Sequence, residues 1–380
     1  MLDFKLTEEQ EQLIASARRF TKERIIPVAA ECDRKSEFPT DVFRAAWETG
    51  LVNPTVPPEY GGIGLGELEN TMITEELAYG CTGIQTSVTA NTLAATPLLL
   101  AATEEQKKKY LGALTAEPIF AAYATSEPEA GSDVAGMQCK FTKHGDDYVL
   151  NGTKCWITNA SRASWFVIFA TSDPKARHKG IAAFIVDRDA PGFRVGKHED
   201  KLGQRASDTC VLHLDDVKVP KANLLAAEGA GFKLAMETFN QTRPDIGAGA
   251  VGLMRRCLDE CVAYAKDRKT FGVPIAQHQM IQWMLAEMAI RIEATQLLVR
   301  KAAWALDSKA RSPIVSSCSK AYGADSAMAT AIDAVQIFGG NGYTKEYPVE
   351  KLMRDAKVLQ IYEGTSQIQR MVIAKAVLGG

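Results

Sequence analysis

The sequence has little of what marks nucleic-acid-binding or membrane proteins. Its 44 Lys and Arg residues balance 46 Asp and Glu residues for a formal net charge of -2, and there is no long basic run. A nucleic-acid partner is therefore not expected. The longest apolar stretch, residues 93–102, is broken by Thr and Pro and is too short to span a bilayer.

Paired cysteines and clustered histidines are also missing. The eight cysteines include no CxxC pair, and Cys257 and Cys261 have no further Cys or His near them in sequence to complete a metal set. The five histidines are isolated, so neither a metal site nor a Ser-His-Asp triad is predicted. Buried thiols indicate a reducing compartment. Together with an acidic N-terminus that does not fit a targeting peptide, they lead us to expect the bacterial cytoplasm or mitochondrial matrix.

No alternation of strands and helices occurs, which argues against a Rossmann domain. Helical patterns with capping boxes at Thr7-x-x-Gln10 and Thr103-x-x-Gln106 fill residues 1–115. Residues 116–224 contain short strand patterns at 165–171, 181–187, 210–214 and 217–219, and a predicted hairpin that turns at Asn151-Gly152. The helical period returns over 225–380. We predict an α+β fold: an N-terminal helical domain, a small antiparallel β-domain and a C-terminal helical bundle.

Residues 247–252 match the dinucleotide-binding pattern GxGxxG. That motif must follow a strand and open a helix. Here it lies inside a helical stretch that runs from Phe232 to about Asp267, with a predicted interruption at Pro244. We interpret the small residues as a place where two helices pack closely, and not as a nicotinamide site.

Residues 361–370 place one carboxylate, Glu363, between two helical patterns. Ser366-x-x-Gln369 is interpreted as a capping box that opens the second helix. Gly364 lets the backbone approach a ligand closely, and a carboxylate in apolar surroundings has a raised pKa and can act as a base. The alternative is a surface glutamate in an ordinary helix connection.

Four further segments have chemical content. Residues 123–132 form a loop rich in hydroxyls, and Trp156 and Thr158 share a strand face that can meet a flat ligand. Arg268–Gly272 combines cations with an aromatic, which suits phosphate, and residues 336–343 are dense in glycine. Taken singly, each is also explained by a plain turn, a strand end, a solvated helix end or a helix C-cap.

Taken together and in this order, the five segments resemble the acyl-CoA dehydrogenase family, most of all its medium-chain branch. The resemblance extends over nearly the whole chain and includes Arg354-Asp355-Ala356-Lys357. It implies the helical–β–helical fold read independently above, assembled as a homotetramer. It also implies FAD as cofactor, an acyl-CoA substrate of fatty-acid β-oxidation, and electron-transferring flavoprotein as electron acceptor.

The resemblance also implies roles for individual residues. Glu363 would take the α-proton of a medium- or short-chain acyl-CoA thioester while the β-carbon gives a hydride to flavin N5, which yields a trans-2-enoyl-CoA. The backbone N–H of Glu363 and a ribityl hydroxyl of FAD would donate hydrogen bonds to the thioester carbonyl. Residues implied to contact substrate are Ser132, Asn240, Arg243, Tyr362, Glu363 and Gly364. Residues implied to contact FAD are Tyr123, Ala124, Thr125, Ser126, Ser132, Trp156, Ile157, Thr158, Arg268, Phe271, His278, Gln279, Gln336, Ile337, Phe338, Gly339, Gly340, Thr365, Ser366 and Gln367; of these, Arg268, Gln279 and residues 336–340 would reach the FAD of an adjacent subunit.

Departures from the family pattern limit these expectations. Thr242 stands where some branches place their base, so Glu363 is the only carboxylate predicted to serve. Asn240 replaces the more common Asp, and Thr89 replaces a Glu at the closed end of the acyl pocket, which leaves the acyl chain length open. Glu129 replaces a small residue in the hydroxyl-rich loop and is expected to face solvent. An acyl-CoA oxidase, a flavin-dependent enoyl-CoA reductase and a non-catalytic CoA- or flavin-binding protein remain alternatives.

Overall fold

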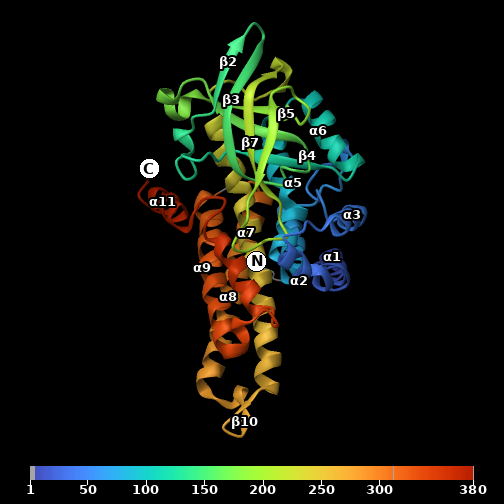
Figure 1. Ribbon diagram of the computed structural model, residues 1–380, viewed down its shortest axis with the longest axis vertical. Coiled ribbons are helices and arrows are strands. Elements are labelled where there is room, and N and C mark those ends of the chain that lie inside the picture. Colours follow the sequence, from blue (N-terminus) through green and yellow to red (C-terminus); the bar gives the residue numbers. More distant parts are fainter. Residues whose placement is uncertain (1–4, 311, 380) are drawn as a thin grey trace.

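The computed structural model describes residues 5–310 and 312–379, and it has the predicted α+β order of helices, sheet and helices (Figure 1). The first four residues of the N-terminal helical domain lie outside the described part. Side chains of Thr7 and Thr103 accept from the backbone N–H groups of Gln10 and Gln106 at 3.2 Å, so both predicted capping boxes are confirmed. The N-terminal helices are α1 (Glu8–Phe20), a π-helical turn (Thr21–Ile25), α2 (Ile26–Lys35), α3 (Thr40–Glu48), α4 (Glu67–Gly80), α5 (Thr82–Ala101) and α6 (Glu104–Ala116).

The middle region is one sheet whose described strands run in the order β6-β7-β3-β2-β4-β5-β8, with β1 added against β4. It is antiparallel except where β1 and β2 pair with β4 in parallel. The strands predicted at 165–171 and 181–187 are confirmed, whereas 210–214 and 217–219 form one continuous strand. The strands are β1 (Phe120–Ala124), β2 (Lys140–His144), β3 (Asp147–Thr158), β4 (Ala163–Thr171), β5 (Ile181–Asp187), β6 (Phe193–His198), β7 (Thr209–Val219) and β8 (Leu224–Leu225).

The predicted hairpin turn at Asn151-Gly152 is wrong. Both residues lie inside β3, at a shift in its pairing with β7, and the chain turns earlier, between β2 and β3. The Asn151 side chain donates to Asp216 at 2.9 Å instead of closing a turn. Gly152 has a φ of 151°, and a Cβ there would lie 2.7 Å from the Cα of Cys139. The glycine therefore serves a β-bulge and a close backbone approach.

The C-terminal helices form a long bundle that extends away from the sheet (Figure 1). Contrary to our prediction, Pro244 does not interrupt α7, and the 37-residue helix continues through it. Because proline has no backbone N–H, it donates no helical hydrogen bond at this position. None of the described helices combines the length and the apolar character that crossing a membrane requires. The elements are α7 (Gly231–Asp267), β9 (Lys269–Thr270), β10 (Val273–Pro274), α8 (Gln279–Asp307), α9 (Pro313–Phe338), α10 (Val349–Leu359) and α11 (Ser366–Val377).

The GxGxxG match lies in the middle of α7 and packs helices together, as the sequence predicts. A Cβ on Gly252 would lie 2.2 Å from the carbonyl oxygen of Glu75 in α4. One on Gly247 would lie 2.7 Å from a methyl carbon of Val299 in α8. These approaches require glycine because no larger residue leaves room for the neighbouring helix.

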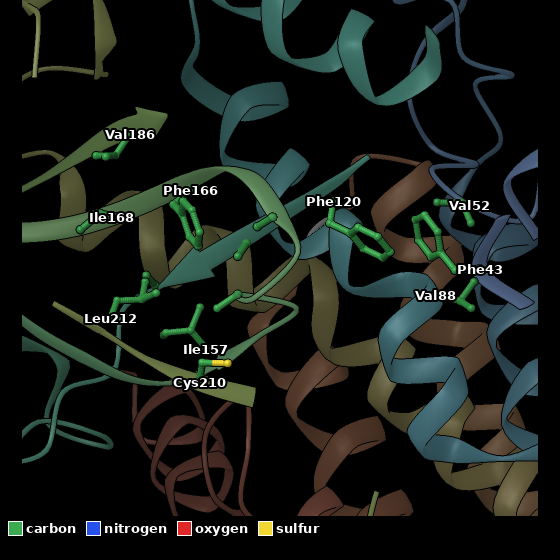
Figure 2. Packing of buried hydrophobic residues seen from close by; sticks show 14 of the residues in the cluster. Phe43, Val52, Val88, Phe120, Ile157, Phe166, Ile168, Val186, Cys210 and Leu212 are labelled. Carbon is green, nitrogen blue, oxygen red and sulfur yellow. The ribbon is translucent and has the colours of Figure 1, made fainter. Parts of the chain in front are cut away.

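One apolar core joins the N-terminal helices to the sheet. Phe43 of α3 stacks on Phe120 of β1 with ring centroids 3.8 Å apart. Figure 2 shows how this cluster continues from Val88 in α5 to Phe166 and Ile157 in the sheet. The shared core fixes β1, and with it the loop that follows, against the helices.

Candidate active site

Glu363 lies in the short loop between α10 and α11, as predicted. Its φ is 50° and that of Gly364 is 89°, so two successive residues are left-handed. A non-glycine residue rarely adopts this conformation, and the residues that do are often found at functional sites. Helix α11 begins one residue away from our prediction: Thr365 is the N-cap and accepts from the N–H of Ile368. The capping box Ser366-x-x-Gln369 is therefore wrong.

Gln369 binds the loop that carries Glu363. Its Nε2 donates to the carbonyl oxygens of Glu363 at 3.1 Å and Gly364 at 3.0 Å. The side chain is fully buried. It turns back toward the loop because Thr365 already caps the helix.

The carboxylate of Glu363 points toward α7, where the Thr242 hydroxyl donates to Oε2 at 2.7 Å. Desolvation raises the pKa of Glu363, while the hydrogen bond from Thr242 and the charges of Lys320 and Arg243 act in the opposite direction. A raised pKa means that the basic form is lost at a higher pH than in an exposed glutamate. The group combines a fixed orientation with the pKa direction expected of a general base.

A pair of buried carboxyl groups, Asp245 and Glu67, lies near Glu363, and no sequence pattern predicts it. Asp245 follows Thr242 by one turn of α7, and Asn70 of α4 donates to its two oxygens at 2.9 and 3.0 Å. Burial, followed by the charge of Glu363, raises the pKa of Asp245, and burial also raises the pKa of Glu67. The pair therefore favours its protonated forms, in which it does not compete with Glu363 as a base.

The predicted substrate contacts differ in how deeply they are buried. Arg243 is buried and donates to Asn240 at 2.6 Å and to Ser317 at 3.3 Å, so its guanidinium lies in the interior of the protein and not at the surface. Tyr362 is partly buried, and its hydroxyl accepts from Gln204 at 3.5 Å. Ser132 is exposed in the loop after β1.

The residues predicted to face the flavin gather at the end of β1 and of β3. Tyr123 and Thr125 are buried, and their hydroxyls make no hydrogen bond of normal geometry to the described residues, although they lie near each other. Trp156 is 61% exposed beside the buried Ile157 and the partly buried Thr158. Ala124, the last residue of β1, is buried; in the loop that follows, Ser126 is partly buried and Glu129 is exposed as expected.

A buried ion pair that we did not predict supports this loop. Lys154 of β3 donates to Glu127 at 2.7 Å and to the carbonyl oxygen of Thr125 at 3.1 Å. Glu127 also accepts from the backbone N–H of Cys139 at 3.0 Å. A lysine between strand residues carries no sequence signal that it points inward, and the pair emerges only when the sheet is assembled.

The remaining predicted FAD contacts lie elsewhere, at the far end of the bundle. Arg268, Ile337, Phe338, Gly339 and Gly340 line one cleft. Lys320 of α9 contacts the Glu363 loop, and Phe338 ends the same helix, so the two places are about 27 Å apart at 1.5 Å per residue. Around this cleft Gln336 and Gln279 are exposed, the Phe271 ring is 96% exposed, and His278 contacts Thr270 at 2.9 Å. Thr365, Ser366 and Gln367 instead adjoin Glu363.

Comparison with known proteins agrees with these features. Models of the acyl-CoA dehydrogenase N-terminal, middle and C-terminal domains match residues 7–118, 122–217 and 229–378. A probable medium-chain specific acyl-CoA dehydrogenase 2 of Caenorhabditis briggsae is 48% identical over 100% of this chain and 92% of its own length. The structure of butyryl-CoA dehydrogenase from Megasphaera elsdenii is 38% identical, with a TM-score of 0.97 over 99% of this chain and 100% of that one.

A more distant solved structure, described as PigA with FAD and proline, is 29% identical, with a TM-score of 0.95 over the whole of both chains. The scaffold is thus common to proteins whose names point to different substrates. All three domain models nevertheless match in order, and they cover most of the sequence. The chain belongs to the acyl-CoA dehydrogenase family of flavoprotein oxidoreductases.

Proposed function

We propose that this enzyme oxidises a short- or medium-chain fatty acyl-CoA to its trans-2-enoyl-CoA. Glu363 takes the proton from the α-carbon, and the β-carbon loses a hydride, which carries the second hydrogen together with two electrons. The observation that carries the proposal is the Glu363 carboxylate, partly buried and held by Thr242 at 2.7 Å. The backbone N–H of Glu363 is suited to donate a hydrogen bond to the thioester carbonyl oxygen, because negative charge develops on that oxygen as the α-proton leaves.

FAD fits the residues at the end of β1 and β3, and when bound it supplies the hydride acceptor. The buried hydroxyls of Tyr123 and Thr125 lack hydrogen bonds of normal geometry to the described residues and would find partners on a polar ring edge. The exposed Trp156 offers an aromatic plane, and Ile157 and Thr158 continue the same strand end. We assign the FAD contacts predicted from the sequence to these residues and to those at the start of α11.

The cleft at Arg268 is too far along α9 to hold the same flavin, so we propose that it holds the FAD of a neighbouring subunit in a homotetramer. The outer faces of α8 and α11 agree with this, because large apolar side chains are exposed there and at the residue after α11: Met280, Trp283, Ile290, Leu297, Trp304, Met371, Val377 and Leu378. Burying such side chains between subunits is favourable. Sedimentation equilibrium is expected to give the mass of four chains of 41.3 kDa. A monomer that retains FAD would contradict the shared site.

Two other activities of the same scaffold differ in how the reduced flavin is used. A dehydrogenase passes its electrons to an electron-transferring flavoprotein, and the 61% exposure of Trp156 leaves part of this side chain open to such a partner. An oxidase would pass them to oxygen, and an enoyl-CoA reductase would run the reaction in reverse. A non-catalytic binding protein has no use for a buried, hydrogen-bonded carboxylate at position 363. We therefore favour the dehydrogenase.

Anaerobic titration of the FAD-loaded enzyme tests the proposal. Octanoyl-CoA or butyryl-CoA is expected to bleach the flavin absorption band, and the ratio of their rates, with palmitoyl-CoA added to the series, gives the preferred chain length. Thr89 carries no charge, and its hydroxyl accepts from Gln85 at 2.9 Å inside α5. A flavin that stays oxidised with all three thioesters would contradict the proposed function, and rapid reoxidation in air would favour the oxidase.

A further inference from the structure

Lys320 is a buried cation in the N-terminal third of α9, and the proposed chemistry does not use it. Its side chain is fully buried, and Nζ donates to the carbonyl oxygen of Gly364 at 2.6 Å. The nearby charges are Glu363, Arg243 and Asp325. The Asp325 carboxylate already accepts from Gln360, Ser366 and Arg370. The ammonium instead donates its hydrogen bond to the loop that carries Glu363.

The loop needs such support because its backbone is left-handed at Glu363 and again at Gly364. An ordinary glutamate would leave this conformation unless neighbouring groups held it. Two donors hold it here. Gln369 binds both carbonyl oxygens of the loop from α11, and Lys320 binds the second of them from α9. The two peptide planes are thereby fixed, and with them the direction in which the Glu363 side chain leaves the backbone toward Thr242.

We propose that Lys320 is a positioning residue for the base: its ammonium clamps the Gly364 carbonyl, and its charge keeps Glu363 ionised. The second half follows from the geometry, since the buried ammonium contacts the carbonyl oxygen of Gly364, the residue next to Glu363. Burial lowers the pKa of Lys320 to about 8, so the group still carries its proton at neutral pH. The inference rests on the proposed function in one respect, namely that Glu363 is the base.

Other groups also face Glu363 and belong in any account of its titration. Thr242 and Arg243 approach from α7, and both lower its pKa, as Lys320 does. The groups whose own pKa values respond to the charge of Glu363 are Tyr123 of β1, Tyr362 of the same loop, Asp245 of α7 and Glu67 of α4. Among these neighbours, Lys320 alone combines a charge with a hydrogen bond to the loop itself.

The test compares two variants of the FAD-loaded enzyme, with the rate of flavin reduction followed from pH 5 to 9. Lys320→Met removes the donor and the charge. It is expected to lower the rate by about 10- to 100-fold, since small misplacements of a catalytic group have effects of this size. It is also expected to shift the acidic limb to higher pH, because a positive charge that favoured the carboxylate is gone. Gln369→Leu removes donors only and is expected to lower the rate without moving that limb.

A merely structural role for Lys320 would slow both variants equally and leave the limb unmoved, and that result would overturn the inference. Lys320→Arg keeps the charge and is expected to return the limb to its wild-type position. If Lys320→Met fails to retain FAD, Lys320→Arg takes its place in the test. A shift of its acidic limb to higher pH would then contradict the role of the charge. If the wild type is not reduced by any acyl-CoA, the proposed function fails instead. If the flavin of the wild type is reduced and the Lys320 variants have the same rate and pH dependence, this inference alone is rejected.

Discussion

Replacement of Glu363 by Gln is expected to slow flavin reduction by acyl-CoA by about 10²- to 10⁴-fold, the range that a positioned general base contributes. Glutamine has nearly the same shape and can still bind Thr242, which now donates to Glu363 at 2.7 Å. It cannot accept a proton from the α-carbon. FAD content and the free energy of unfolding should remain close to those of the wild type, because the change leaves the loop's backbone hydrogen bonds intact. Anaerobic stopped-flow absorbance measures the rate.

The matched control is Thr242→Val, which keeps the carboxylate but removes its hydrogen bond. Since that hydrogen bond lowers the pKa of Glu363, its loss should move the acidic limb of the rate to higher pH without abolishing the reaction. If the flavin absorption band of Glu363→Gln bleached at the wild-type rate, another group would take the proton. Asp245 would then be the first to examine, because it is the carboxyl group one turn away on α7.

The order of helices, sheet and helices was predictable because each part has its own hydrophobic period. Errors arose where tertiary contacts decide between local alternatives. Asn151-Gly152 has the composition of a hairpin turn, yet it lies within β3, because Cys139 approaches Gly152 too closely for any side chain. Pro244 suggests a break, yet α7 continues because its neighbours hold the helix on both sides of the proline.

The candidate site was predictable to the extent that its residues are adjacent in sequence. Glu363 is recognisable from its loop, and the residues that position it are not. Thr242, Lys320 and Gln369 come from three different helices, and Gln369 had a plausible local role as a capping residue that Thr365 fills instead. In the same way, local sequence could not show that the Arg268 cleft lies about 27 Å along α9 from the Glu363 loop.

The loop after β1, which contains Thr125 and Glu127, offers the strongest test of how the middle sheet supports the candidate site. Lys154 is fully buried, and Glu127 is 4% exposed; their side chains are 2.7 Å apart. Removal of one partner leaves the other charge buried without compensation, which costs about 3–5 kcal/mol in folded proteins. Lys154→Met, which keeps the length of the side chain, is therefore expected to lower the free energy of unfolding by about that amount. Denaturant titration followed by circular dichroism measures it.

The same variant should weaken FAD binding, since Lys154 also holds the carbonyl oxygen of Thr125, whose hydroxyl faces the proposed flavin site. Lys197→Met is the matched control in the same sheet: its ammonium is 3.2 Å from Glu199 but mostly exposed, and exposed pairs contribute about 0–1 kcal/mol. The double variant Lys154→Met, Glu127→Gln should recover part of the stability, because no unpaired charge remains in the interior. FAD affinity should stay low in the double variant, since the contact to Thr125 is still missing. Equal stability of Lys154→Met and Lys197→Met would contradict the argument, and it would mean that water reaches Glu127 once the lysine is gone.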